Sequence, residues 1–130
     1  MTAPRLLVPL SFALISACAQ QPTQPVELDA ESECPTRLQV GQVLTLTLPS
    51  NPSTGYRWRV EKPAANVLRS LGPEVYSAPE EEDLVGNAGV STWRYQASGT
   101  GDGQLVLVYQ QPWAADIAPV QTFDCKIIVR

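Results

Sequence analysis

The chain of 130 residues is long enough for one domain with a single buried core, and its formal net charge is −4. This negative charge argues against nucleic acid as a partner and against an electrostatic hold on anionic lipid. The sequence contains no histidine, so the commonest general base and the usual zinc ligand are both missing. Composition therefore disfavours a nucleic-acid-binding protein and most hydrolytic enzymes.

The first 17 residues predict an export signal. Arg5 supplies a positive charge, and an apolar run at residues 6–15 is too short to span a bilayer. The run ends Ile15-Ser16-Ala17-Cys18, which resembles the lipobox of bacterial lipoproteins, where the new N-terminal cysteine is lipidated. With Ala19 next, the resemblance implies an outer-membrane lipoprotein facing the periplasm, or a cell-surface one, held to the membrane only by this anchor. The alternative is an ordinary signal peptide that contains a cysteine.

Residues 18–32 are predicted to form a flexible tether, because their polar, proline-rich composition cannot bury enough apolar surface to fold. The folded domain is then expected at residues 33–130. Three cysteines are present, and lipidation of Cys18 would leave Cys34 and Cys125 to pair as a disulfide in an oxidising compartment. The alternative is two free, buried thiols.

The folded part alternates apolar and polar residues with a period of two, which is typical of strands with one buried face. We assign Trp58 to the core on this pattern. Short strands separated by turn signals roughly every 8 to 12 residues predict an all-β fold, an immunoglobulin-like two-sheet antiparallel β-sandwich. A helical turn near residues 64–67 is an alternative to the start of the third strand. The strands are expected at 43–48, 56–60, 67–71, 74–77, 90–97, 105–109 and 122–129.

The side chains offer little to an enzyme. Lipid and disulfide account for the cysteines, and Ser53 and Thr54 have no visible activating base. The acidic run at residues 80–83 lacks the spacing of a calcium-binding loop. We therefore expect a protein that is not an enzyme and that uses no metal and no cofactor.

Three loop segments stand out instead. The first loop, Asn51-Pro52-Ser53-Thr54-Gly55-Tyr56, is short and pinned between two strands, so little conformational entropy remains to be lost on binding. The second loop is Gly86-Asn87-Ala88-Gly89, and the third loop is Gln111-Pro112-Trp113. Taken alone, each segment has a composition that is ordinary for a turn.

Together, in this order and at this spacing, the three loops resemble those of the chagasin family, proteinaceous inhibitors of papain-like cysteine proteases from protozoa and bacteria. The resemblance extends from about residue 38 to residue 129. It implies a monomer whose loops gather at one end of the sandwich and block the protease cleft as a wedge, reversibly and without a covalent bond. The first loop would cross the catalytic cysteine and histidine, with Ser53 and Thr54 nearest the nucleophile. The second loop would follow one side of the cleft, and Pro112 and Trp113 would contact the leaving-group side.

The chain departs from the family's usual pattern at three places. Threonine is usual where Ser53 stands, and a Gly-x-Gly-Gly motif is often found where Asn87-Ala88 interrupts the glycines. Arginine usually precedes the Pro-Trp pair, where Gln111 stands here. The last change predicts that a charge-assisted contact, or a support for the third loop, is missing.

A rival interpretation is an envelope lipoprotein that uses the same sandwich to bind peptide or glycan, or that has a structural role. The fold alone does not separate the two functions. A glycan platform would display several exposed aromatic side chains, whereas Trp113 stands nearly alone among the loops. Loop composition therefore favours the inhibitor.

Overall fold

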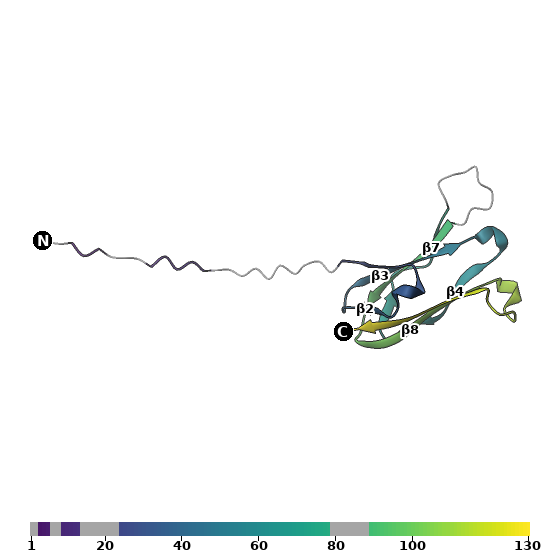
Figure 1. The fold of residues 1–130 in the computed structure, drawn as a ribbon. Coiled ribbons are helices and arrows are strands. Elements are labelled where there is room, and N and C mark those ends of the chain that lie inside the picture. The colour runs from purple at the N-terminus through teal and green to yellow at the C-terminus, as the bar shows by residue number, and fades with distance from the viewer. Residues whose placement is uncertain (1–2, 6–8, 14–23, 79–88) are drawn as a thin grey trace.

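The structure is a computed structural model that describes residues 3–5, 9–13, 24–78 and 89–130. Two β-sheets pack face to face as the layers of a sandwich (Figure 1), which confirms the predicted immunoglobulin-like fold. The described residues include no helix that is long and apolar enough to cross a membrane. Cys18, the acidic run at 80–83 and Gly86, Asn87 and Ala88 of the second loop lie outside the described residues.

The first sheet is built around strand β7 (Gly89–Ala97), which pairs with β3 (Val43–Ser50) on one side. On its other side β7 pairs with the short strands β5 (Leu68–Ser70) and β6 (Val75–Ser77). The two strands predicted at 67–71 and 74–77 are therefore confirmed. A turn does precede β5, since the backbone amides of Val67 and Leu68 donate to the Ala64 carbonyl.

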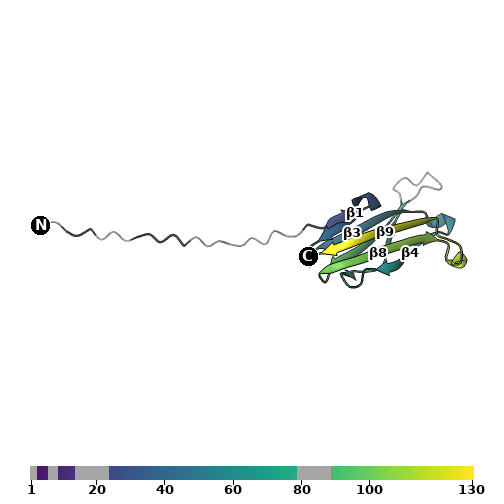
Figure 2. The ribbon, with the colours of Figure 1, turned by 60° about the horizontal axis from the view of Figure 1, so that its bottom comes forward.

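The second sheet has the strand order β2-β9-β8-β4, and Figure 2 shows β9, β8 and β4 side by side. Strand β8 is central and antiparallel to both neighbours, and its apolar run at 105–108 is buried on both faces. Strand β2 runs parallel to β9. The strands are β2 (Thr36–Leu38), β4 (Arg57–Pro63), β8 (Gly101–Gln110) and β9 (Gln121–Val129).

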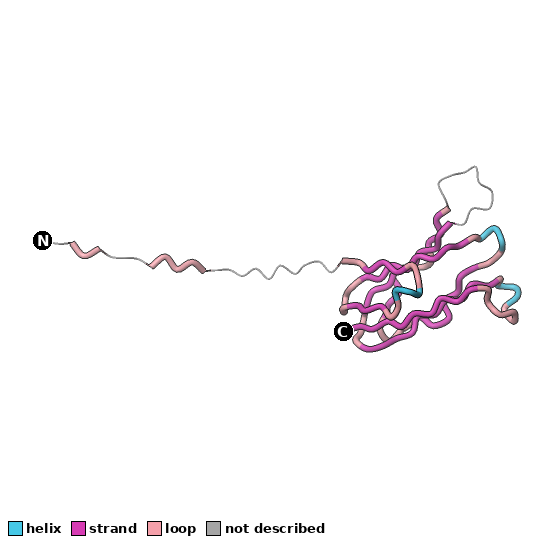
Figure 3. The backbone as a smooth tube through the Cα atoms, viewed as in Figure 1, coloured by secondary structure: helices cyan, strands magenta, loops and turns pink. Residues whose placement is uncertain are grey.

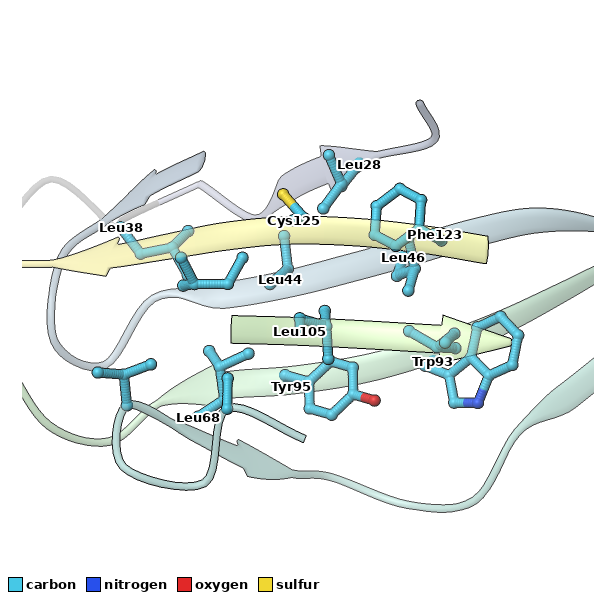
Figure 4. Packing of buried hydrophobic residues seen from close by; sticks show 14 of the residues in the cluster. Leu28, Leu38, Leu44, Leu46, Leu68, Trp93, Tyr95, Leu105, Phe123 and Cys125 are labelled. Carbon is cyan, nitrogen blue, oxygen red and sulfur yellow. The ribbon is translucent and has the colours of Figure 1, made fainter. Parts of the chain in front are cut away.

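The core fills the space between the two layers. In β3, Leu44 and Leu46 are fully buried while Thr45 between them is only half-buried, as the period of two predicts. Trp58 is buried as predicted, and its ring meets Trp93 edge to face with centroids 6.5 Å apart. Burial also raises the pKa of the Tyr95 hydroxyl, which stays protonated at neutral pH. Figure 4 shows much of this cluster, with Leu28, Leu38, Leu44, Leu46, Leu68, Trp93, Tyr95, Leu105, Phe123 and Cys125 labelled.

The predicted tether at 18–32 is wrong at its C-terminal end. Strand β1 (Val26–Leu28) pairs in parallel with β3, and Leu28 is buried in the core with 1% of its surface exposed. A short 3-10 helix, η1 (Glu31–Glu33), follows, and the Glu31 carboxylate accepts a hydrogen bond from the Asp124 amide at 2.7 Å. A three-residue strand is too short to show periodicity, and only its pairing with a distant strand gives it structure.

The predicted disulfide between Cys34 and Cys125 is confirmed. Cys125 lies on the inward face of β9 and is buried, while Cys34 sits between η1 and β2. The bond joins residues 91 positions apart in the sequence. It therefore ties the first elements of the domain to its last strand.

Replacing both cysteines by alanine is expected to lower the free energy of unfolding by about 4 kcal/mol, because the disulfide restricts a long loop in the unfolded chain. Chemical denaturation of the wild type and the double variant, with and without reductant, measures this difference. Reductant should bring the wild type close to the double variant and leave the variant unchanged. Equal stability of the oxidised wild type and the variant would contradict the prediction.

Candidate functional site

The first and third loops lie beside each other at one end of the sandwich. Each contains a short 3-10 helix, η2 (Pro52–Thr54) and η3 (Pro112–Ala114), and Figure 3 shows both at the end away from the C-terminus. Their proximity follows from strand pairing. The first loop leads into β4 and the third follows β8, and Arg57 and Gln110 are partners where these two strands pair.

Hydrogen bonds within the first loop hold it in one shape. The Asn51 side-chain oxygen accepts from the Ser53 amide at 3.3 Å and from the Ser53 hydroxyl at 2.5 Å. The Thr54 hydroxyl donates to the Asn51 carbonyl at 2.7 Å. Pro52 favours the start of the short helix, and Gly55 closes the turn with a left-handed φ of 81°.

Tyr109, at the end of β8, anchors the first loop to the core. Its hydroxyl accepts a hydrogen bond from the Asn51 amide at 2.9 Å. Its ring stacks on Trp58 with centroids 4.8 Å apart and lies 5.4 Å from the Tyr56 ring. The loop therefore stands on a stack of aromatic side chains that continues into the core.

Arg57, the first residue of β4, supports the same loop from the strand that pairs with β8. One guanidinium nitrogen donates to the Pro52 carbonyl at 3.1 Å and to the Tyr56 carbonyl at 3.0 Å. Sequence reasoning assigned no role to Tyr109 or Arg57. The only signal available was position, since both residues flank a predicted loop.

The third loop contacts the first loop directly. The Gln111 side-chain amide donates to the Thr54 carbonyl at 3.2 Å. The Trp113 indole lies against Gly55, since a Cβ at Gly55 would stand only 2.3 Å from the indole Cη2. The prediction that a support is missing at Gln111 is therefore wrong, because a neutral amide joins the two loops there.

Trp113 is the most exposed aromatic side chain of the first and third loops. One edge of its indole covers Gly55, yet 72% of its surface remains accessible to solvent. Burying so large an apolar surface is a strong source of binding energy. The third loop thus displays an indole that is already positioned by the first loop.

Gly89, the last residue of the second loop and its one described residue, lies at the same end of the molecule. Gly89 begins β7 opposite Ser50, the residue that precedes the first loop. A Cβ at Gly89 would lie 2.2 Å from the Ser77 carbonyl oxygen and 2.6 Å from the Tyr76 hydroxyl, so only glycine allows β6 to approach this closely.

The arrangement supports binding and offers no catalytic pair. The hydroxyl of Ser53 is bonded to an amide oxygen and that of Thr54 to a backbone carbonyl, and neither acceptor is a base. Among the described residues, no group of three or more His, Cys, Asp or Glu side chains could hold a metal ion. The first and third loops thus form one contacting surface at an end of the sandwich.

Comparison with known proteins identifies the family. Residues 37–127 match the model of the chagasin family peptidase inhibitor I42. Amoebiasin-1 of Entamoeba histolytica is 32% identical over 92 residues, which cover 69% of this chain and 84% of that protein. The chain therefore belongs to the chagasin family of peptidase inhibitors, and this membership confirms the prediction that it is not an enzyme.

Solved structures share the fold. The crystal structure of the cysteine protease inhibitor EhICP2 from Entamoeba histolytica has a TM-score of 0.71 at 21% identity, covering 82% of this chain and 96% of that one. The structure of PbICP-C in complex with falcipain-2 has a TM-score of 0.53 at 18% identity, and the match covers 84% of this chain and 93% of that one.

Gly55→Ala is expected to separate the first and third loops, because the new methyl group would collide with the indole and alanine is strained at this φ. Gly41→Ala is the matched control: its φ is 90°, but nothing lies within 4 Å of the new Cβ. Both variants should lose stability, while only Gly55→Ala should shift the Trp113 indole N–H resonance in the NMR spectrum. An unshifted resonance in Gly55→Ala would show that the loops are not in contact.

Tyr109→Phe keeps the stacked ring and removes only the hydroxyl. The Asn51 amide would lose its acceptor, so the free energy of unfolding should fall by about 1 kcal/mol. Hydrogen exchange of the Asn51 amide should also accelerate. Unchanged exchange would mean that Tyr109 does not hold the first loop.

Proposed function

We propose that this protein inhibits papain-like cysteine proteases reversibly and without a covalent bond, by inserting the three loops into the active-site cleft. The observation that carries the proposal is the contact between the first and third loops, which form one rigid projection with an exposed indole. The family is one of peptidase inhibitors. Two structural relatives are a cysteine protease inhibitor and a protein in complex with falcipain-2.

Internal hydrogen bonds make the first loop a poor substrate. The Thr54 carbonyl already accepts from Gln111, and the Pro52 carbonyl accepts from Arg57 and from the Gly55 amide. A carbonyl held in this way has to break internal bonds before it can turn toward a nucleophile. We infer that the loop covers the catalytic cysteine with Ser53 and Thr54 and occludes the cleft without being cleaved.

Binding costs little conformational entropy because the loops are ordered before they meet the enzyme. The second loop, residues 86–89, is assigned to one side of the cleft, where backbone groups of its glycines would form the contacts. Pro112 and Trp113 are assigned to the leaving-group side, where the indole would stack on aromatic residues of the enzyme. Trp113 would be the main apolar anchor of the interface.

We further propose that the inhibitor is a monomer anchored at Cys18 to the outer membrane and facing the periplasm, or exposed on the cell surface. The support is the lipobox-like sequence that ends at Cys18 and the tether that follows. Mass spectrometry of the membrane-extracted protein tests the anchor. A lipid-modified N-terminal cysteine is expected, and an unmodified Cys18 would overturn this part of the proposal.

Inhibition is tested by titrating a soluble chain into papain and a cathepsin-type enzyme. The chain starts at residue 18 and carries Cys18→Ser, which prevents lipidation and keeps β1 in the domain. Reversible, competitive inhibition is expected at sub-micromolar concentration. Absence of inhibition by the folded, oxidised chain at micromolar concentration would overturn the proposed function.

Trp113→Ala should raise the inhibition constant roughly 30-fold or more, as truncation of an aromatic anchor does. Thr54→Ala should raise it less, because that variant loses a loop hydrogen bond but keeps the anchor. Val40→Ala is the control, since Val40 is also exposed but lies between β2 and β3, at the other end of β3 from the first loop. If Trp113→Ala inhibits as the wild type does, the assignment of the third loop is wrong.

A further inference from the structure

The connection after the third loop exposes two large apolar side chains that none of the loop assignments uses. We call residues 114–120 the trailing segment, which leads from the third loop to β9. Ile117 is 64% exposed and Val120 is 59% exposed. Single exposed apolar residues are common on protein surfaces. These two follow Trp113, itself exposed, within seven positions of the same connection, so the apolar surface of the third loop continues into the trailing segment.

The trailing segment is held in place by backbone hydrogen bonds. The Ala114 amide donates to the Gln111 carbonyl and the Ile117 amide to the Ala114 carbonyl, both at 3.0 Å. The Val120 amide donates to the Tyr109 carbonyl, also at 3.0 Å. Because the hydroxyl of the same Tyr109 holds Asn51, the trailing segment and the first loop share one anchor.

The two apolar side chains also border the first loop. Ile117 and Val120 line a hollow of about 90 Å³ together with Tyr56 and Gln111. The hollow is too small for a typical small-molecule ligand. Its walls instead make the trailing segment continuous with the surface that the first and third loops present.

We propose that Ile117 and Val120 extend the inhibitory surface beyond the third loop and bind an apolar rim of the protease on the leaving-group side. This inference rests on the proposed function. Papain-like enzymes whose rim is apolar at this place would be inhibited more strongly than those whose rim is polar or charged. Apolar side chains in fixed positions suit such a rim, because their burial requires little further ordering.

The double variant Ile117→Asp with Val120→Asp, in the soluble chain, tests the contact. The control is Val40→Asp, which places a carboxylate at another exposed apolar side chain, 53% accessible, away from the loops. Inhibition constants are measured against papain-like enzymes chosen for apolar or polar residues along the leaving-group rim, and thermal unfolding confirms that each variant is folded.

In the double variant, the inhibition constant should rise at least tenfold against enzymes with an apolar rim. Against enzymes with a polar rim it should rise less than threefold. Val40→Asp should leave the inhibition constants against both groups of enzymes unchanged. Wild-type inhibition by the double variant, or an equal loss against both groups of enzymes, would overturn the inference and leave the proposed function intact. No inhibition by the wild type would overturn the proposed function itself.

Sedimentation of the soluble chain tests whether a second copy of the protein, rather than a protease, covers this surface. The wild type and the double variant are both expected to sediment as monomers. A wild-type dimer that the double variant abolishes would overturn the inference, because the apolar surface would then serve self-association.

Discussion

The end of this protein that we propose as the binding end depends on Tyr109, which connects its loops to the core. Its ring stacks on Trp58 and so joins the hydrophobic core. Its hydroxyl accepts from the Asn51 amide at the start of the first loop, and its carbonyl accepts from Val120 at the end of the trailing segment. One side chain and one carbonyl thus connect the core to both sides of the projecting surface, which is why these loops can be stiff although they lie at the edge of the fold.

In the proposed function, this stiffness lets the described loops, in which Ser53 and Thr54 have no base beside them, oppose an enzyme. Affinity requires that the loops lose little freedom on binding, and resistance to cleavage requires that their carbonyls stay out of reach. The same hydrogen bonds serve both requirements, since Gln111 and Arg57 each bind a carbonyl of the first loop. The sandwich contributes the geometry: β4 and β8 are neighbours, so the loops at their ends emerge together.

Local patterns in the sequence are sufficient to predict β3 to β9 and the loop motifs, but not the short strands β1 and β2. Alternation identified β3, and the apolar run at 105–108 indicated a central strand. Such patterns do not predict contacts between residues that are far apart in the sequence. Strand β1 is too short for periodicity, and nothing local shows that it pairs with β3 and buries Leu28, or that Gln111 reaches Thr54. The contact from Gln111 to Thr54 depends on the pairing of β4 with β8, which brings the two loops together, and no local pattern indicates it.

The central claim is that a preformed surface blocks the protease cleft without rearrangement and without chemistry. A crystal structure of the inhibitor bound to active papain tests it most directly. We expect the first loop to cross the catalytic cysteine with all its peptide bonds intact, and the hydrogen bonds from the Asn51 amide to the Tyr109 hydroxyl and from Gln111 to Thr54 to persist. A cleaved or refolded first loop, or a protease bound to another face of the sandwich, would contradict the account.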